Sequence, residues 1–264
     1  MFHEPIDFAA MYRAHKASTD FKSKTCSDWD EKSSDMAASV INSPYVNDFI
    51  SRMNLSGDEV VLDIGCGPGT LAIPLAKRVK EVIAIDFSAQ MLEELKAYTT
   101  REGVTNIKTY HIGWEDDWSH LPQIDIVVAS RSIEVPDIET ALMKMSTFAR
   151  KACYLTYKVG GSFVDMNILD YIGKKVKTKP DYWYIPIILY TQGYLPRIDY
   201  IETGRGSVRS TTEEDFVESL IWSVHELTED QKAKARQYYR DVIVAQNRPP
   251  RSVNWAFISW ETTL

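Results

Sequence analysis

The strongest constraint on the fold of this chain is the stretch Val60–Asp86, which reads VVLDIGCGPGTLAIPLAKRVKEVIAID. An apolar run with one acid, Asp63, leads into the turn Gly65-Cys66-Gly67-Pro68-Gly69, and a segment with helical periodicity follows. A second β-branched run, Val82–Ile85, then ends on Asp86. Ligands of parallel α/β sheets bind outside the carboxyl ends of the strands, and glycines let the backbone approach them closely. The stretch therefore predicts a nucleoside-binding half-fold.

The spacing of the glycines narrows the choice of nucleoside. Turns that bind dinucleotides usually read G-x-G-x-x-G and hold a pyrophosphate at the helix N-terminus. Here the order is G-x-G-x-G, and Asp63 stands two residues before the first glycine. A carboxylate at that position would repel a pyrophosphate, whereas it suits the ammonium group of S-adenosylmethionine, which has a ribose, an adenine and no phosphate.

The motif D-I-G-C-G-P-G-T, with an acid at the end of the next strand, resembles the class I S-adenosylmethionine-dependent methyltransferases over about Leu55–Tyr157. The resemblance implies a Rossmann-like α/β fold with a mostly parallel seven-stranded sheet and helices on both faces. It also implies S-adenosylmethionine as cofactor and S-adenosylhomocysteine as product. No metal motif is present, and no nucleophile–base pair can be identified, so the catalytic residues are unknown at this level.

The expected cofactor contacts follow from the resemblance and from strand ends. They are Asp63, Gly65, Cys66, Gly67, Gly69, Asp86, Phe87, Met91, Trp114, Glu115, Ser130, Arg131 and Trp29. Asp86 is expected to accept hydrogen bonds from the ribose hydroxyls. Asp63 either reaches the ammonium, directly or through water, or braces the turn. Phe87 and Met91 either pack beside the adenine or belong to the core.

The sequence does not decide how two loops, after the third and fourth strands, contact the cofactor. Related methyltransferases often have Gly-Asp-Ala after the third strand, and that acid accepts the adenine amino group. Here Trp114 takes the place of the acid and Glu115 follows, so Glu115, the backbone or a stacked Trp114 would contact the purine, unless the loop is only a solvated acidic turn. After the fourth strand, backbone groups at Ser130 are expected beside the methionine part. Arg131 pairs with the cofactor carboxylate or an acidic substrate, or lies on the surface.

The remaining sequence predicts the layout of the domain. Expected strands are Val60–Ile64, Val82–Ile85, Asn106–His111, Ile124–Ala129, Ala152–Tyr157, Arg197–Thr203 and Val253–Trp260. Expected helix starts are Ser88, Asp137 and the capping boxes Thr211–Glu214 and Thr228–Gln231. Residues 1–50 are expected to form an N-terminal helical cap with Trp29 near the cofactor, 51–205 and 251–264 the core, and 206–250 a helical insertion that serves as substrate lid.

Charge and composition limit the function. The chain has 264 residues and a net charge of -7, which argues against a general nucleic-acid binder. Lysines and arginines do concentrate over residues 144–179, either as a solvated surface or as a site for an anionic partner. No apolar run could span a membrane, the N-terminus lacks the apolar block of a signal peptide, and the three cysteines are scattered. We therefore expect a cytoplasmic protein without a membrane partner.

The leading functional hypothesis is methyl transfer, in line, to an O, N, S or C atom of a small molecule. An aromatic or apolar acceptor would be held by the Tyr182–Tyr194 region, which is expected to be helical, and by the insertion. The alternatives are an RNA or protein methyltransferase, a non-catalytic module that binds the cofactor, and, more distantly, a nicotinamide dehydrogenase. The sequence leaves the oligomeric state open, with a homodimer as one option.

Overall fold

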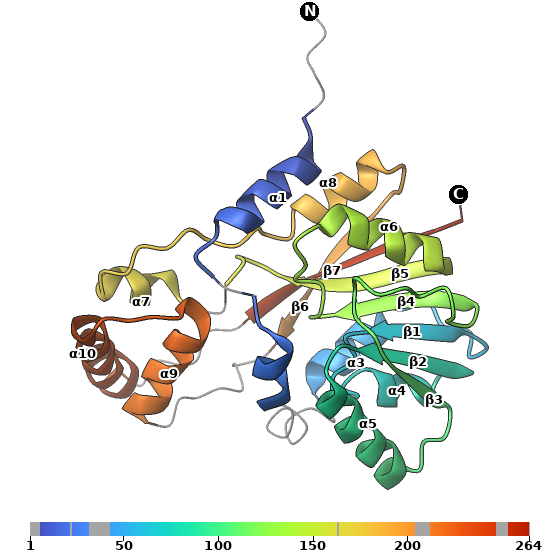
Figure 1. Cartoon of the computed structure of the whole chain (residues 1–264), viewed down its shortest axis with the longest axis horizontal. Helices are drawn as coiled ribbons and strands as arrows, with labels where there is room; N and C mark the ends of the chain where they lie inside the picture. Colours follow the sequence, from blue (N-terminus) through green and yellow to red (C-terminus); the bar gives the residue numbers. More distant parts are fainter. Residues whose placement is uncertain are drawn as a thin grey trace, which may run out of the picture.

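The centre of the molecule is one seven-stranded sheet with the order β3-β2-β1-β4-β5-β7-β6 (Figure 1). The structure is a computed structural model that describes residues 6–21, 23–31, 43–162, 164–203, 212–246 and 253–263. The strands are β1 (Val60–Ile64), β2 (Glu81–Asp86), β3 (Ile107–His111), β4 (Ile124–Ser130), β5 (Ala149–Lys158), β6 (Arg197–Thr203) and β7 (Val253–Glu261). β7 runs antiparallel to β5 and β6, and all other pairs are parallel. The predicted fold class and its seven strands are confirmed.

Helices cover both faces of this sheet. They are α1 (Phe8–Ser18), α3 (Pro44–Ser51), α4 (Ala72–Ala76), α5 (Ala89–Glu102), α6 (Ile138–Phe148), α7 (Met166–Tyr171), α8 (Tyr184–Thr191), α9 (Glu213–Val224), α10 (Glu229–Tyr238) and the π-helix η1 (Tyr239–Val244). Side chains alternate between the faces of a strand. Leu62 and Ile83 accordingly pack with α1, α6 and α8, whereas Val61 and Val82 pack with α3, α4 and α5.

Most predicted helix starts are present. The Ser88 side chain accepts from the amide of Met91, and Thr228 forms a capping box with Gln231. The predicted box between Thr211 and Glu214 is wrong, because α9 begins one residue later and its box joins Thr212 to Asp215. The sequence TTEED offers two overlapping registers of this motif, and Thr211 lies outside the described residues.

A third apolar cluster joins α7, α9, α10 and η1 into a helical unit at one side of the sheet (Figure 1). Leu169 of α7 is fully buried there beside Leu220 of α9 and Tyr238 of α10. The helical unit therefore takes in a segment that precedes β6, in addition to the described part of residues 206–250.

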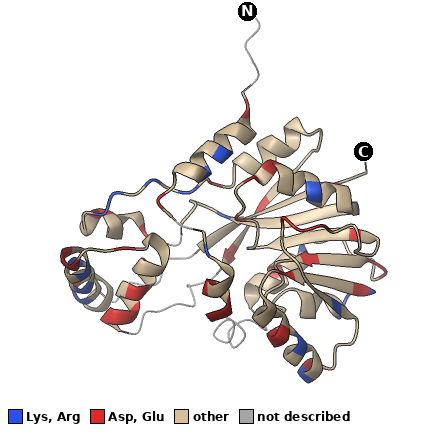
Figure 2. Cartoon of the chain, viewed as in Figure 1, with Lys and Arg blue, Asp and Glu red and all other residues tan. Residues whose placement is uncertain are grey.

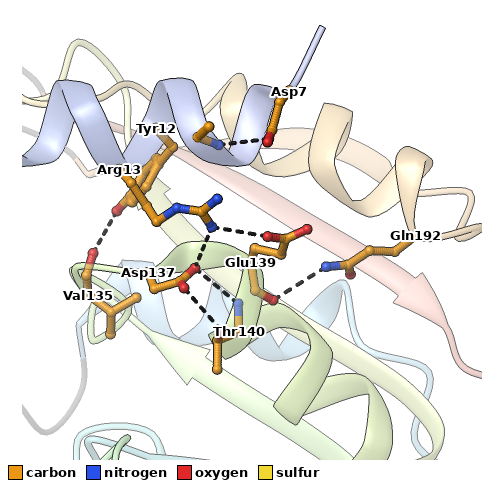
Figure 3. Close-up of polar contacts among 9 residues, drawn as sticks. Asp7, Tyr12, Arg13, Val135, Asp137, Glu139, Thr140 and Gln192 are labelled. Atoms are coloured by element: carbon orange, nitrogen blue, oxygen red, sulfur yellow. Dashed lines mark hydrogen bonds and ion pairs between the residues drawn. The ribbon is translucent and has the colours of Figure 1, made fainter. Parts of the chain in front are cut away.

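α1 is fixed to the start of α6 by polar contacts. Figure 3 shows Arg13 between the carboxylates of Glu139 and Asp137, at 3.1 and 3.4 Å. The hydroxyl of Tyr12 donates to the carbonyl of Val135 at 2.9 Å, and burial raises the pKa of Tyr12 to about 12. α1 thus lies on a sheet face beside α6, whereas Asp30 of a later N-terminal segment reaches the residues just after β2.

Candidate functional site

The glycine turn between β1 and α4 is tied to the end of β2. The amide of Gly65 donates to the carbonyl of Ile85 at 2.8 Å, and the amide of Gly67 donates to Oδ2 of Asp86 at 2.8 Å. Gly65, Gly67 and Gly69 have φ angles of 64°, 52° and 97°, a region that side chains disfavour. We call this turn together with Asp63 and Asp86 the cradle.

The three glycines meet different surroundings. A Cβ at Gly65 would lie 2.5 Å from Cβ of Ser132, and one at Gly69 would lie 2.4 Å from a side chain of α5. A Cβ at Gly67 would find its nearest neighbour, Sδ of Met91, at 4.0 Å. Gly65 and Gly69 are therefore required by close packing, whereas Gly67 borders open space.

The cradle holds two buried acids. Asp63 is 1% exposed, and its Oδ2 has no hydrogen-bond partner among the described residues. Burial, and next the charge of Asp86, raise the pKa of Asp63 to about 8 against the opposing hydrogen bond of the Ala72 amide. Burial also raises the pKa of Asp86, although the amides of Ser88 and Gly67 oppose the shift. A buried carboxyl oxygen without a partner is costly, and a cation beside Asp63 would supply a partner and favour the ionised carboxylate.

The other predicted residues near β2 differ in accessibility. Cys66 and Met91 are buried, and Cys66 packs in the core, which leaves only its backbone for a ligand. Phe87 is 42% exposed and lies against Gly113, whose Cβ would be 3.2 Å from Cβ of Phe87. We call Phe87, Ser88 and Gly113 the rim of the cradle. His111 supports this rim, because its Nε2 lies 2.9 Å from the carbonyl of Phe87.

The loop after β3 is held from α6. Lys144 donates to the carbonyl of Trp114 at 2.8 Å and to that of Asp116, and its ammonium lies 3.9 Å above the Trp118 ring. The indole nitrogen of Trp114 donates to the carbonyl of Ser132 at 2.9 Å, while the side chain of Glu115 is exposed. Lys144 was part of a charged run in the sequence, where nothing marked it as a loop support.

The carboxyl ends of β4 and β5 lie beside the start of β7 and beside α3, on the other side of β1 from β2. We call the residues that meet there the outer edge: Ser130, Arg131, Tyr45, Thr156 and Trp255. The Tyr45 hydroxyl lies 2.8 Å from Oγ of Ser130 and 2.6 Å from Oγ1 of Thr156. The amide of Arg131 donates to Oγ1 of Thr156 at 3.1 Å, and its guanidinium lies 4.2 Å above the Tyr45 ring. Nothing in the sequence around Tyr45, Thr156 or Trp255 indicated that they belong to one site, because they come from three distant elements, α3, β5 and β7.

Residues 24–31, which we call the bridging segment, connect the cradle side to the helical unit. Oγ of Ser88 donates to Oδ1 of Asp30, just beyond the end of β2. The ring of Trp29 meets that of Trp222 in α9 edge to face, with centroids 6.4 Å apart. The predicted cap residue Trp29 thus contacts the predicted lid.

The aromatic residues of the segment 182–194 differ in burial. Tyr184 is 4% exposed and packs edge to face on Tyr12 of α1, with centroids 5.6 Å apart. Tyr190 is 68% exposed on the same helix, α8. The core position of Tyr184 removes it from the residues that could line a substrate wall.

The basic residues at positions 150–158 lie at opposite ends of one strand. Arg150 pairs with Asp125 and Lys151 with Glu59 at the start of β5, whereas Lys158 ends that strand. The colouring of the ribbon in Figure 2 shows acidic positions next to basic positions along α5 and α10. No helix in the described ranges has the length and apolar character needed to cross a membrane.

Comparisons with known proteins agree with this geometry. A family model described as a methyltransferase domain matches residues 61–152. An uncharacterized protein of Haemophilus influenzae is 34% identical over 97% of this chain and 96% of its own length. The YcgJ protein of Bacillus subtilis has a similar structure, with a TM-score of 0.56 at 16% identity over 82% of this chain and 97% of its own.

Shorter matches lead to methyltransferases of two kinds. A probable ribosomal RNA small subunit methyltransferase A of Methanosphaera stadtmanae is 31% identical over 42% of this chain and 45% of its own length. Trans-aconitate 2-methyltransferase of Rhodococcus jostii is 27% identical over 44% of each chain. This chain therefore spans less than half the length of these two relatives.

The sheet order and the glycine turn at its carboxyl edge define a Rossmann-like nucleoside-binding fold. With the domain match, the chain belongs to the class I S-adenosylmethionine-dependent methyltransferase family. It is an enzyme whose methyl donor is S-adenosylmethionine.

Proposed function

We propose that the cradle binds S-adenosylmethionine with its ammonium at Asp63 and its ribose at Asp86. The unpartnered, buried Oδ2 of Asp63 supports the first contact, because a cation would supply the missing partner. The second is supported by the two amides of Gly67 and Ser88, which fix the orientation of the Asp86 carboxylate and leave each oxygen a further lone pair. The bound cofactor supplies an electrophilic methyl group on a sulfonium.

The adenine is proposed to lie against the exposed ring of Phe87, with Met91 behind Gly67. Glu115 is our candidate acceptor for the adenine amino group, since the indole nitrogen of Trp114 already binds the loop after β4. The backbone at Ser130 and Arg131 would lie beside the methionine part, at the end of the strand adjacent to β1.

Replacement of Asp86 tests the ribose contact. Asp86→Ala is expected to lose most of its affinity for S-adenosylhomocysteine in calorimetry, because a buried acceptor for two hydroxyls is removed. Asp86→Asn keeps the shape of the side chain and controls for disruption of the turn. Unchanged affinity in both variants would exclude the ribose assignment.

We further propose that the acceptor is a small molecule. The observation that carries this is the bridging segment, which joins the rim of the cradle through Asp30 to the helical unit through Trp29. A site spanned by its own chain suits an acceptor that is enclosed, and methyl transfer from a sulfonium gains from exclusion of water. The chain's tasks are then alignment of the acceptor and closure.

Methyl tracing tests the acceptor class. The protein is incubated with methyl-labelled S-adenosylmethionine in three separate reactions. They contain the small-molecule, RNA or protein fraction of one cell extract. Label is expected in the small-molecule fraction only. A ribosomal RNA acceptor is the second candidate, favoured by the 121-residue similarity to a ribosomal RNA methyltransferase, and label in RNA would select it.

A further inference from the structure

The outer edge contains an arginine in an unusual backbone conformation. Arg131 follows β4 directly and has a φ angle of 60°, although it is not glycine. Such strain persists where the surrounding structure imposes it, and it concentrates at functional sites. Here the amide of Arg131 is held by Oγ1 of Thr156, which itself is bound by the Tyr45 hydroxyl.

The guanidinium of Arg131 is preorganised. It lies 4.2 Å above the ring of Tyr45 and 5.8 Å from that of Trp255, so two aromatic rings fix its plane. Tyr45 is in turn fixed, because it is buried and its hydroxyl contacts Ser130 and Thr156. Four elements, α3, β4, β5 and β7, thus hold one cation in place.

The same guanidinium is exposed and has no carboxylate within ion-pair distance in the described part of the chain. Stacking on rings leaves the edge of a guanidinium available, and that edge presents donors in the fork that matches a carboxylate or phosphate. A fixed arginine with an available edge is a site for an oxyanion.

The positions of the two aromatic rings show on which side of β4 an oxyanion would bind. β4 has β1 with its glycine turn on one side, and β5 and then β7 on the other. Trp255 belongs to β7 and pairs in register with Lys158, the last residue of β5. The guanidinium of Arg131 therefore lies between the rings of Tyr45 and Trp255, on the side of β4 that faces β5 and β7.

We infer that the acceptor substrate is anionic and that its carboxylate or phosphate binds the guanidinium of Arg131 at the outer edge. This inference rests on the proposed small-molecule methyltransferase function. It names the substrate class: a small acid whose remaining body lies between Arg131 and the cofactor.

Fractionation of the acceptor pool tests the class. A small-molecule extract is separated by ion exchange into anionic, neutral and cationic pools, and each is incubated with the enzyme and methyl-labelled S-adenosylmethionine. Label is expected from the anionic pool. Phosphatase treatment beforehand removes an acceptor that binds through phosphate and spares a carboxylate. Label from the neutral or cationic pool alone overturns the inference and leaves the proposed function intact, whereas label only in RNA or protein overturns both.

Variants of Arg131 test the residue. With the active anionic pool, Arg131→Gln is expected to raise the apparent KM at least tenfold, and Arg131→Lys less, because the charge remains. Arg101→Gln is the matched control, since Arg101 also stacks on a tyrosine, 4.1 Å above Tyr98, but on the outside of α5. It should leave KM unchanged.

The carboxylate of the cofactor is the other anion that could bind the guanidinium of Arg131. Binding of S-adenosylhomocysteine and of 5′-methylthioadenosine, which lacks the amino acid part, is measured by calorimetry. Arg131→Gln is expected to change neither affinity by more than twofold. A tenfold loss for S-adenosylhomocysteine with unchanged binding of 5′-methylthioadenosine assigns Arg131 to the cofactor and overturns the inference.

Discussion

The cradle and the outer edge lie at the same end of one sheet and are built in opposite ways. The cradle comes from one short stretch of chain, and its polar side chains are two buried acids, Asp63 and Asp86. The outer edge brings together residues from α3, β4, β5 and β7, and its ionised group is the exposed Arg131. A cofactor common to a family can be bound by a local motif, whereas the side that we assign to the acceptor depends on distant contacts.

The largest effect is expected in the cradle, from Asp63→Asn. Loss of the carboxylate should weaken binding of S-adenosylhomocysteine by about 10- to 100-fold, the range for a hydrogen bond to a charged group. Calorimetry measures the affinity, and Asp58→Asn, in the exposed turn before β1, serves as the acid-to-amide control. Wild-type affinity in Asp63→Asn would show that the acid only braces the turn.

Although Asp63→Asn should weaken cofactor binding, it should make the cofactor-free protein more stable at high pH. In an unfolded chain Asp63 ionises near pH 4, but in the folded protein its pKa is about 8. Between these values the folded state holds a proton that the unfolded state has lost, so Asp63 makes the stability of the cofactor-free protein fall as pH rises. Asp63→Asn should flatten this slope and raise Tm at pH 8, measured by thermal denaturation from pH 5 to 8.

The second prediction separates two glycines of the cradle. Gly65→Ala should lower the free energy of unfolding by about 2–3 kcal/mol, because its Cβ would overlap Cβ of Ser132 in a left-handed backbone. Gly67→Ala has only the backbone strain, about 1 kcal/mol, yet its methyl would enter the proposed cofactor space. Urea denaturation and cofactor titration should therefore rank the two variants in opposite order, and the same order in both assays would contradict the proposed lining.

The third prediction concerns the outer edge. Tyr45→Phe removes a hydroxyl that contacts Ser130 and Thr156, and should cost about 1–2 kcal/mol of stability. Affinity for S-adenosylhomocysteine should stay within about twofold, since Asp63, Asp86 and the backbone groups of Ser130 are all retained, while turnover of the acceptor falls. Tyr98→Phe, on the outside of α5, is the control. A loss of cofactor affinity as large as that of Asp63→Asn would erase the distinction between the two sides.

The smallest effect is expected at the bridging segment. Trp29→Ala removes the edge-to-face contact with Trp222, and loss of an aromatic pair should weaken cofactor binding by about 2- to 10-fold. Hydrogen exchange should show faster exchange in residues 24–31 and in α9, and less protection by cofactor. Trp183→Ala is the control, because Trp183 stacks on Tyr184 of α8. Identical exchange in both variants would argue against a closing role.

The parts of the fold that could be predicted are those that depend on residues close together in sequence. Short segments rich in apolar, β-branched or aromatic residues marked the strands, and Ser88 and Thr228 marked helix starts, because these signals span only a few residues. The register of the α9 cap could not be predicted, since Thr211 and Thr212 satisfy the same pattern. The membership of α7 in the helical unit also escaped, because it depends on burial of Leu169 against α9 and α10.

The sequence by itself determined the class of protein and the cradle, because one contiguous motif carries the strand, the glycine turn and both acids. Tertiary structure alone decided that Tyr184 is core and that Lys144 supports the loop after β3. It also decided the outer edge, where Tyr45 and Thr156 are 111 residues apart in sequence and 2.6 Å apart in space. Contacts of that separation leave no periodic trace in a chain, since each partner is chosen by the packing of a different element.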